Sequence, residues 1–282
     1  MKKWTVVFLL CLLCMGAGKG LYWAKDGFNA RRIHGLTNGF TEDLNTEAKL
    51  ALTQTFHYIG RGRQCFAFAS ADDRYVLKFL RTDIYKLPFW TRVLPVKSYR
   101  KWLEEEQQRR EQFIRNSFEI SFSELKDQTG LVAIHLGASQ AIAERLTVVD
   151  KLGCKHHIPL ESTSFVLQYK RPLLTKIFTQ ALQQREREQI LDALVDAVVA
   201  RAQKGILNRD RSFIRNYGFD GQRAYQIDVG SFFRQQGLDP AAAFQKSLLD
   251  SMGAVQEWLS QKDPEMAIYL NEKLNNLLHN RN

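Results

Sequence analysis

Cysteine is scarce in this chain, with four residues among 282, and two of them, Cys11 and Cys14, lie in an apolar N-terminal segment. The rest of the sequence holds only Cys65 and Cys154. Two cysteines are too few for a disulfide framework, and no Cys/His spacing indicates a zinc site. We therefore expect a fold that is stabilised by its hydrophobic core.

Internal repeats, low-complexity tracts and a nucleic-acid-binding signature are also lacking. The basic residues are scattered, without the interleaved aromatics of a nucleic-acid reader, so we do not expect nucleic acid as a partner. The adjacent His156 and His157 would face opposite ways on a strand and could not chelate one metal together. The composition, 45% hydrophobic and 25% charged, is that of a globular protein. Its net charge of +10 favours anionic partners such as phosphates or acidic lipid headgroups.

A long uninterrupted apolar run is missing as well, although the N-terminus has the layout of a targeting segment. Lys2 and Lys3 precede an apolar run from Trp4 to Ala17, and small residues end it. The run is shorter than the roughly 18 residues expected of a membrane-spanning helix. We expect residues 1–24 to be either a cleavable signal peptide or a retained N-terminal membrane anchor. Because lysines flank both ends of the segment, the sequence leaves the side of the membrane open.

The chain beyond residue 24 is predicted to form a β-rich part and then a helical part. Residues 25–54 are polar and predict a linker, and residues 55–174 predict a β-rich lobe with one long helix. Apolar alternation and turn residues predict six strands, at 55–59, 65–69, 75–80, 131–136, 146–152 and 164–169. Helical periodicity predicts one long helix at 98–126. Residues 175–282 predict a helical lobe, with helices at 176–204, 240–260 and 264–278. The fold class expected is α+β, with two lobes that share a cleft.

A polar loop lies between the predicted helices of the C-terminal lobe. It contains Asn208-Arg209-Asp210 and Asn216, and a short hairpin after it ends in Asp228-Val229-Gly230. This segment resembles the catalytic loop and metal-binding turn of the protein-kinase-like superfamily, which includes small-molecule and sugar kinases. The resemblance implies a two-lobed kinase-like fold with an antiparallel sheet and a reduced helical C-lobe, and it implies ATP and Mg²⁺ as cofactors.

The resemblance also implies roles for particular residues. In the family pattern a catalytic Asp accepts the hydroxyl proton, an Asn and a second Asp hold magnesium, and a strand lysine binds ATP phosphates. Asp210, Asn216, Asp228 and Lys78 match these parts in order. Gly60-Arg61-Gly62 resembles the loop that covers the phosphates, where glycine lets backbone amides approach closely. A glutamate on the long helix should pair with Lys78, and Glu119 is our choice, with Glu111 and Glu106 as alternatives.

Three departures from the family pattern are visible. Asp210 and Asn216 are six positions apart where the family has five, Asn208 replaces a common histidine, and Cys65 replaces the third loop glycine. Each matched residue also has a purely structural explanation, since Asp and Asn cap turns and a strand lysine can extend to solvent.

The sequence supports two functions, and a plain structural envelope protein is the third interpretation. The first function is an ATP- and Mg²⁺-dependent phosphotransferase that acts on a hydroxyl group. The acceptor expected is a small molecule, a glycan or a lipid headgroup and not a protein. The reason is that the stretch after Asp228 has no Ala-Pro-Glu motif and is too short for the substrate platform of a protein-serine kinase. The alternative is a catalytically inactive, pseudokinase-like binding module, exported or membrane-anchored, which recognises a protein partner.

Overall fold

The computed structural model describes residues 4, 7–8, 16, 19–36, 39–87, 91, 97–138, 142, 145–181, 183–212 and 215–279. They fall into two compact units. Unit 1 takes in Met1–Gln108 and Ala133–Leu167, and unit 2 takes in Arg109–Val132 and Gln168–Asn282. The long helix α3 (Lys97–Ser123) therefore contributes its first half to unit 1 and its second half to unit 2. The predicted domain boundaries, at residues 24, 54 and 174, stay a prediction.

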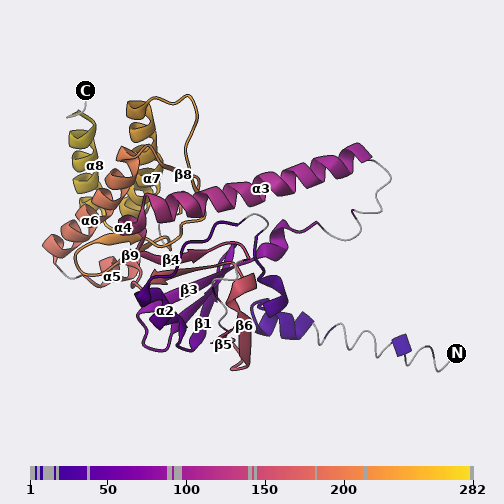
Figure 1. The fold of residues 1–282 in the computed structure, drawn as a ribbon. Helices are drawn as coiled ribbons and strands as arrows, with labels where there is room; N and C mark the ends of the chain where they lie inside the picture. Colours follow the sequence, from indigo (N-terminus) through magenta and orange to yellow (C-terminus); the bar gives the residue numbers. More distant parts are fainter. Residues whose placement is uncertain are drawn as a thin grey trace. The chain divides into compact units, whose positions relative to one another are not determined.

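Unit 1 is built on a seven-stranded sheet in the order β4-β7-β3-β2-β1-β5-β6 (Figure 1). Its strands are β1 (Phe56–Arg61), β2 (Cys65–Ser70), β3 (Tyr75–Leu80), β4 (Leu131–His135), β5 (Arg145–Val149), β6 (Lys155–Pro159) and β7 (Phe165–Tyr169). β2 pairs antiparallel with both β1 and β3, but β1 and β5 run parallel, so the expectation of an antiparallel sheet is corrected at that pair. β5 follows β4 in the chain but lies on the far side of β1 from it, so this connection is a crossover and not a hairpin. Short 3₁₀ helices cover Ala30–Arg32, Thr82–Tyr85 and Leu160–Ser162.

Residues 25–54, predicted as a polar linker, contribute to the core of unit 1. The helix α2 (Thr46–Leu52) buries Ala48, Ala51 and Leu52. Phe28 is 3% exposed, and its ring lies edge-on to those of Phe66 and Phe68, with centroids 5.3 and 5.1 Å apart. Ala48, Ala51 and Leu52 have the spacing of one helix face, but the helix is only seven residues long, and Phe28 stands alone in its stretch, so tertiary packing decides the burial of this segment.

Asp150 ties Lys25, near the start of the described chain, to the β5–β6 hairpin. Its side chain is fully buried, and its Oδ2 lies 2.9 Å from Lys25 Nζ and 2.8 Å from His156 Nε2. The backbone amides of Leu152 and Cys154 both donate to Oδ1 at 3.0 Å. Burial alone would raise the pKa of Asp150, but the hydrogen bonds from His156, Lys25 and the two amides outweigh it and lower the pKa to about 2.

The lowered pKa of Asp150 predicts a pH-dependent stability. A carboxyl group whose folded pKa lies below its unfolded value stabilises the fold above the unfolded pKa of about 3.9, by roughly 2 kcal/mol here. Asp150→Asn imitates the protonated acid, so the wild type should be more stable than the variant at pH 5 to 7, and this gap should close as the pH falls from about 4 to about 2. Urea unfolding at several pH values measures it. The exposed Asp43→Asn is the control, and a gap that is independent of pH would contradict the expectation.

Unit 2 is mainly helical. Its helices after α3 are α4 (Lys126–Thr129), α5 (Leu174–Gln180), α6 (Gln184–Gln203), α7 (Pro240–Lys262) and α8 (Pro264–His279). The long helices α6, α7 and α8 pack side by side around a common apolar core (Figure 1). The helices expected at 240–260 and 264–278 are confirmed, and Asp239 caps the first by accepting from the amides of Ala241 and Ala242. The single helix expected over 176–204 is corrected to α5 and α6, because Gln183 and Glu186 form a capping box that starts a new helix.

The α+β fold class, with a large sheet, a long helix and a helical C-terminal part, is confirmed. Within the described part of the chain, no helix is both long and apolar enough to cross a membrane. Most of the predicted leader lies outside the described residues.

Candidate functional site

Two short strand pairs in unit 2 bring three of the predicted site residues into one neighbourhood. β8 (Leu207–Asn208) pairs with β11 (Phe232–Phe233), and β9 (Tyr217–Phe219) pairs with β10 (Ala224–Gln226). The amide of Arg209 donates to Ser231 O at 2.9 Å, and the amide of Ile227 donates to Asn216 O at 2.8 Å. Ile227, directly before Asp228, is therefore hydrogen bonded to Asn216, and Ser231, three residues after Asp228, is hydrogen bonded to Arg209, the neighbour of Asp210.

The two aspartates are held by local turns. Asp210 is half-buried, and its Oδ1 accepts from the amide of Ser212 at 2.9 Å. Asp228 is exposed, and its Oδ1 accepts from the amide of Gly230 at 3.4 Å. These are the turn-capping contacts that a structural role would use, and they fix each carboxylate relative to its own backbone.

Asn216 differs from the aspartates because its side chain is buried. The residue is 5% exposed, and among the described residues its Nδ2 has no hydrogen-bond partner. The oxygen and nitrogen of an amide are exchanged by a flip, so either atom can occupy that position. The amide of Asn216 and the carboxylate of Asp228 are both sources of the hard oxygen ligands that Mg²⁺ prefers. Asn216 and Asp228 thus fit a magnesium ion by the type of their donor atoms.

The second half of α3 holds the Asp228-Val229-Gly230 turn in place. Ser117 is completely buried, and its Oγ donates to Val229 O at 2.6 Å while it accepts from the amide of Phe232, also at 2.6 Å. Ser121 Oγ reaches the same carbonyl at 3.2 Å. The sequence motif that pointed to Asp210, Asn216 and Asp228 does not include Ser117. A serine at a buried helical position is the signal that could have identified it.

A second contact joins α3 to the candidate catalytic loop. The guanidinium of Arg209 lies over the ring of Phe113, with its carbon 4.2 Å from the ring centroid. Phe233 lies beside both groups, 5.8 Å from the same carbon. Arg209, which directly precedes Asp210, is therefore held against α3 by a cation–π contact.

Glu119 lies on the same helix, two residues beyond Ser117 and so on a different face. The carboxylate of Glu119 lies 3.8 Å from Arg115 Nε, and the side chain of Glu119 is 37% exposed. Glu119 belongs to unit 2 and Lys78 to unit 1, and the pairing of the two stays a prediction.

The other predicted residues lie in the β1–β2–β3 part of unit 1. Lys78 is half-buried on β3 and is paired with Ala67 of β2. Gly60 lies in β1, at a break in the register between β1 and β2, and the amide of Gly62 donates to Cys65 O at 2.9 Å. A Cβ atom added at Gly60 would meet nothing within 4 Å, and at Gly62 only Cys65 O at 3.8 Å. The fold of unit 1 therefore does not itself require glycine at these two positions.

This open space predicts a selective effect of Gly62→Ala. If the loop covers phosphates, the added methyl group should weaken ATP binding about tenfold or more by holding the phosphates away from the backbone amides, while the melting temperature changes little. Isothermal titration with ATP and a thermal melt measure the two quantities. Gly253→Ala, at a helical glycine that is also surrounded by open space, is the control. Equal ATP affinity in both variants would count against a phosphate loop.

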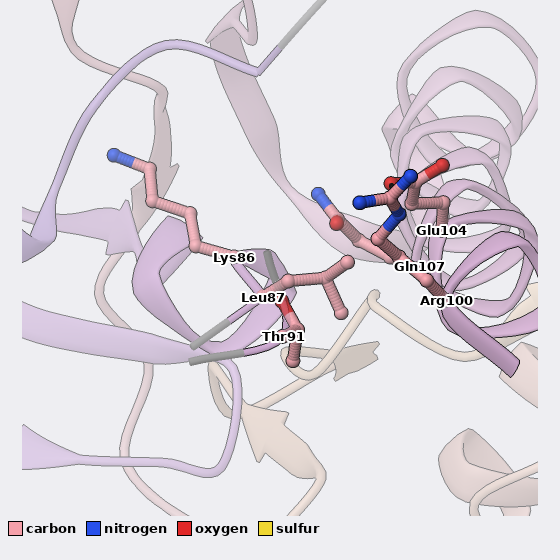
Figure 2. Close-up of a pocket in the computed structure, with 6 residues that line it drawn as sticks. All are labelled: Lys86, Leu87, Thr91, Arg100, Glu104 and Gln107. Carbon is pink, nitrogen blue, oxygen red and sulfur yellow. Dashed lines mark ion pairs between the residues drawn. The ribbon is translucent and has the colours of Figure 1, made fainter. Parts of the chain in front are cut away.

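A cavity of about 370 Å³ in unit 1 is lined by none of the seven predicted residues; its lining residues are Lys86, Leu87, Thr91, Arg100, Glu104 and Gln107. Figure 2 shows Arg100, Glu104 and Gln107 reaching from α3 toward Leu87 and Thr91, with the ammonium of Lys86 directed away from the helix. In the part of the chain that the structure covers, no three His, Cys, Asp or Glu side chains gather where they could hold a metal ion.

Comparisons with known proteins yield weak likenesses. No family model and no curated protein matches the chain. A 2.2 Å crystal structure of WbdD matches with a TM-score of 0.41 and 17% identity, over 86% of this chain and 48% of WbdD. A medium-resolution structure of the bifunctional kinase-methyltransferase WbdD matches with a TM-score of 0.37 and 18% identity, over 85% of this chain and 41% of that one. The chain thus spans less than half the length of these proteins, and TM-scores below 0.5 identify no function.

Proposed function

We propose that the protein is a phosphotransferase that uses ATP and Mg²⁺ to phosphorylate a hydroxyl group. One observation carries the proposal: the hydrogen bonds Arg209–Ser231 and Ile227–Asn216 gather Asp210, Asn216 and Asp228, which are also the residues that match the kinase pattern in order. Phosphoryl transfer needs positioned charges and no nucleophilic side chain of the enzyme. Two carboxylates, an amide and a lysine are therefore sufficient for the chemistry.

Each residue then has a role. Lys78 binds the ATP phosphates beneath the Gly60–Gly62 loop, and Asn216 and Asp228 hold Mg²⁺, which neutralises phosphate charge when bound. Asp210 orients the acceptor hydroxyl and accepts its proton. The acceptor oxygen forms a bond to the γ-phosphorus while the bond from that phosphorus to the leaving ADP oxygen breaks. The acceptor proposed is a small molecule, a glycan or a lipid headgroup, consistent with the lack of an Ala-Pro-Glu motif after Asp228.

A pseudokinase-like binding module is the second candidate, and two observations favour it. The carboxylates of Asp210 and Asp228 already make the turn-capping contacts of a structural role. Asn216 lies six positions after Asp210 instead of five, which changes where its side chain lies in the loop. In this case the fold recognises a partner and transfers no phosphoryl group. The proposed location, exported or held at a membrane by residues 1–24, is compatible with either candidate.

Nucleotide binding and turnover in the full chain test the proposal. With Mg²⁺ and ATP at about a hundred times the Kd, the wild type should be stabilised by about 2.7 kcal/mol in thermal melts and should turn over ATP. Asp228→Asn should lose the Mg²⁺-dependent part of the stabilisation and the turnover. Asp210→Asn should keep the stabilisation and lose turnover by a factor of about 100 or more.

The matched control is Asp196→Asn, an exposed aspartate on α6 that should behave as the wild type. A wild type that binds Mg-ATP but does not turn it over with sugar, lipid-headgroup or water acceptors would replace the enzyme by the binding module. A wild type with no nucleotide response would exclude the phosphotransferase and leave the binding module as the remaining candidate.

A further inference from the structure

The N-terminal turn of α3 exposes two large aromatic side chains. Tyr99 is 47% exposed and Trp102 is 51% exposed, and they lie three residues apart on one side of the helix. Their rings stack, with centroids 5.7 Å apart and planes at 15°. Tyr and Trp with one wet end and one apolar face are the residues that gather at the boundary between membrane and water.

The cavity shows which side of α3 faces the body of unit 1. Arg100, Glu104 and Gln107 line the cavity opposite Leu87 and Thr91 (Figure 2). At about 100° per residue, the direction of Tyr99 and Trp102 differs from that of the cavity-lining residues by more than a right angle. The aromatic pair therefore points away from the body of the unit.

Basic residues lie in the same first turns of α3 as the aromatic pair, but on other sides of the helix. Lys97 is exposed, the side chain of Lys101 is 78% exposed, and that of Arg100 is 38% exposed. The first turn of α3 contains no acidic residue. The positive end of the helix dipole favours acids at this position, so three cations there oppose helix stability. An anionic ligand would remove this electrostatic conflict and also interact favourably with the helix N-terminus.

The acidic residues of α3 begin one turn later. Glu104 lies 4.0 Å from Arg100, and Glu105 lies 3.8 Å from Lys101. One helical turn sets these acids back by about 5 Å along the axis. An anionic surface would repel them if the helix lay flat on it. Contact through the first turn of the helix brings the cations and aromatics closer to the surface than these acids.

We infer that the α3 tip, composed of Lys97, Tyr99, Arg100, Lys101 and Trp102, is a docking surface for an anionic phospholipid membrane. The two rings enter the headgroup region, and the three cations bind lipid phosphates and carboxylates. The chain's net charge of +10 strengthens the attraction to such a surface. This inference does not depend on the phosphotransferase proposal or on the fate of residues 1–24.

The fluorescence of Trp102 tests the inference in the full chain. The wild type is compared with Trp102→Phe, and the other tryptophans and the N-terminal segment are the same in these two proteins. Subtracting the spectrum of Trp102→Phe from that of the wild type leaves the emission of Trp102. On vesicles of phosphatidylcholine with 30% phosphatidylserine, this difference emission should shift to the blue, and phosphatidylcholine brominated in its acyl chains should quench it. An unchanged difference emission on these vesicles overturns the proposal.

The charge requirement is measured by vesicle sedimentation. The triple variant Lys97→Gln, Arg100→Gln, Lys101→Gln should bind the anionic vesicles more weakly, by roughly fivefold for each charge removed, and should bind pure phosphatidylcholine vesicles as the wild type does. The control Lys49→Gln, Arg185→Gln, Lys262→Gln removes three exposed cations elsewhere and should lose clearly less. Equal losses in the two triple variants would reduce the effect to net charge and overturn the docking surface. Trp102 emission that shifts with protein concentration alone would assign the surface to a second copy of the chain, and would equally overturn it.

Discussion

Arg201→Met is expected to lower the free energy of unfolding by about 3–5 kcal/mol, because it removes the donor shared by several buried acceptors. Arg201 lies in the last turn of α6 and is 1% exposed. Its guanidinium donates to Tyr217 Oη, Gln226 Oε1 and Ser251 Oγ, and it lies over the ring of Phe232. Each acceptor left without a partner in the core costs about 1–3 kcal/mol, and methionine recovers part of the loss through packing.

Arg201 also supports the candidate site from behind. Tyr217 follows Asn216 directly, and Gln226 precedes Ile227, whose amide binds the carbonyl of Asn216. Loss of Arg201 should therefore loosen the β9–β10 hairpin that presents Asn216 and Asp228. We expect faster hydrogen exchange at the amide of Ile227 than at amides in the middle of α7.

Chemical unfolding followed by circular dichroism measures the predicted loss of stability. Arg185→Met, at an exposed position near the start of α6, is the matched control and should change stability by less than about 0.5 kcal/mol. Arg201→Lys keeps the charge but lacks the planar fork, so it should fall between the wild type and methionine. An Arg201→Met chain as stable as the wild type would show that the three acceptors find other partners.

Arg201 illustrates where sequence reasoning reached its limit. The apolar period of α6 runs through Leu191, Leu194 and Val198, and the next position on that face is Arg201. The period therefore marked the position as buried, but the identity of the residue indicated solvent. Only the neutral acceptors from β9, β10 and α7, far apart in the sequence, allow a guanidinium to be buried at this position.

Elements with a strong local signal were predicted well. β1, β2 and β3 follow from alternation around Gly60–Gly62, and the starts of α7 and α8 follow from Asp-Pro pairs. β6 was missed as a strand because its burial pattern exposes three of five residues, although His156 and His157 do face different partners, Asp150 and Thr147. α2 was missed because only three of its residues are buried in a polar segment.

The roles of the candidate site residues stay a prediction, and the sequence pattern did not include the surroundings of these residues. A motif that is ordered in sequence gave Asp210, Asn216 and Asp228, and the pairs β8–β11 and β9–β10 show how the chain gathers them. The contacts of α3 with this region, through Ser117 and through Phe113, join positions about a hundred residues apart. No local pattern encodes such contacts, since they depend on how the helix packs in unit 2.

Ser117→Val is expected to reduce Mg²⁺-dependent ATP turnover about 100-fold if the chain has the proposed activity. Valine is close to serine in size but offers neither donor nor acceptor, so both Val229 O and the amide of Phe232 lose the Ser117 hydroxyl. These two groups lie on either side of Gly230, one and four residues after Asp228, and their loss should let the turn move away from α3. A 100-fold change corresponds to about 2.7 kcal/mol, within the range expected for unpaired buried backbone groups.

Rescue by a conservative variant separates positioning of the turn from general damage to the fold. Ser117→Thr keeps the hydroxyl and should retain most of the Mg²⁺-dependent turnover and of the thermal stabilisation by nucleotide. Ser117→Val should lose both, even at temperatures where the variant is folded. Ser123→Val, which removes an exposed serine that donates to the carbonyl of Glu119 on the same helix, should behave as the wild type. If Ser117→Val kept full turnover, Ser121 Oγ, at 3.2 Å from Val229 O, would be sufficient to hold the turn, and α3 would position Asp228 through packing alone.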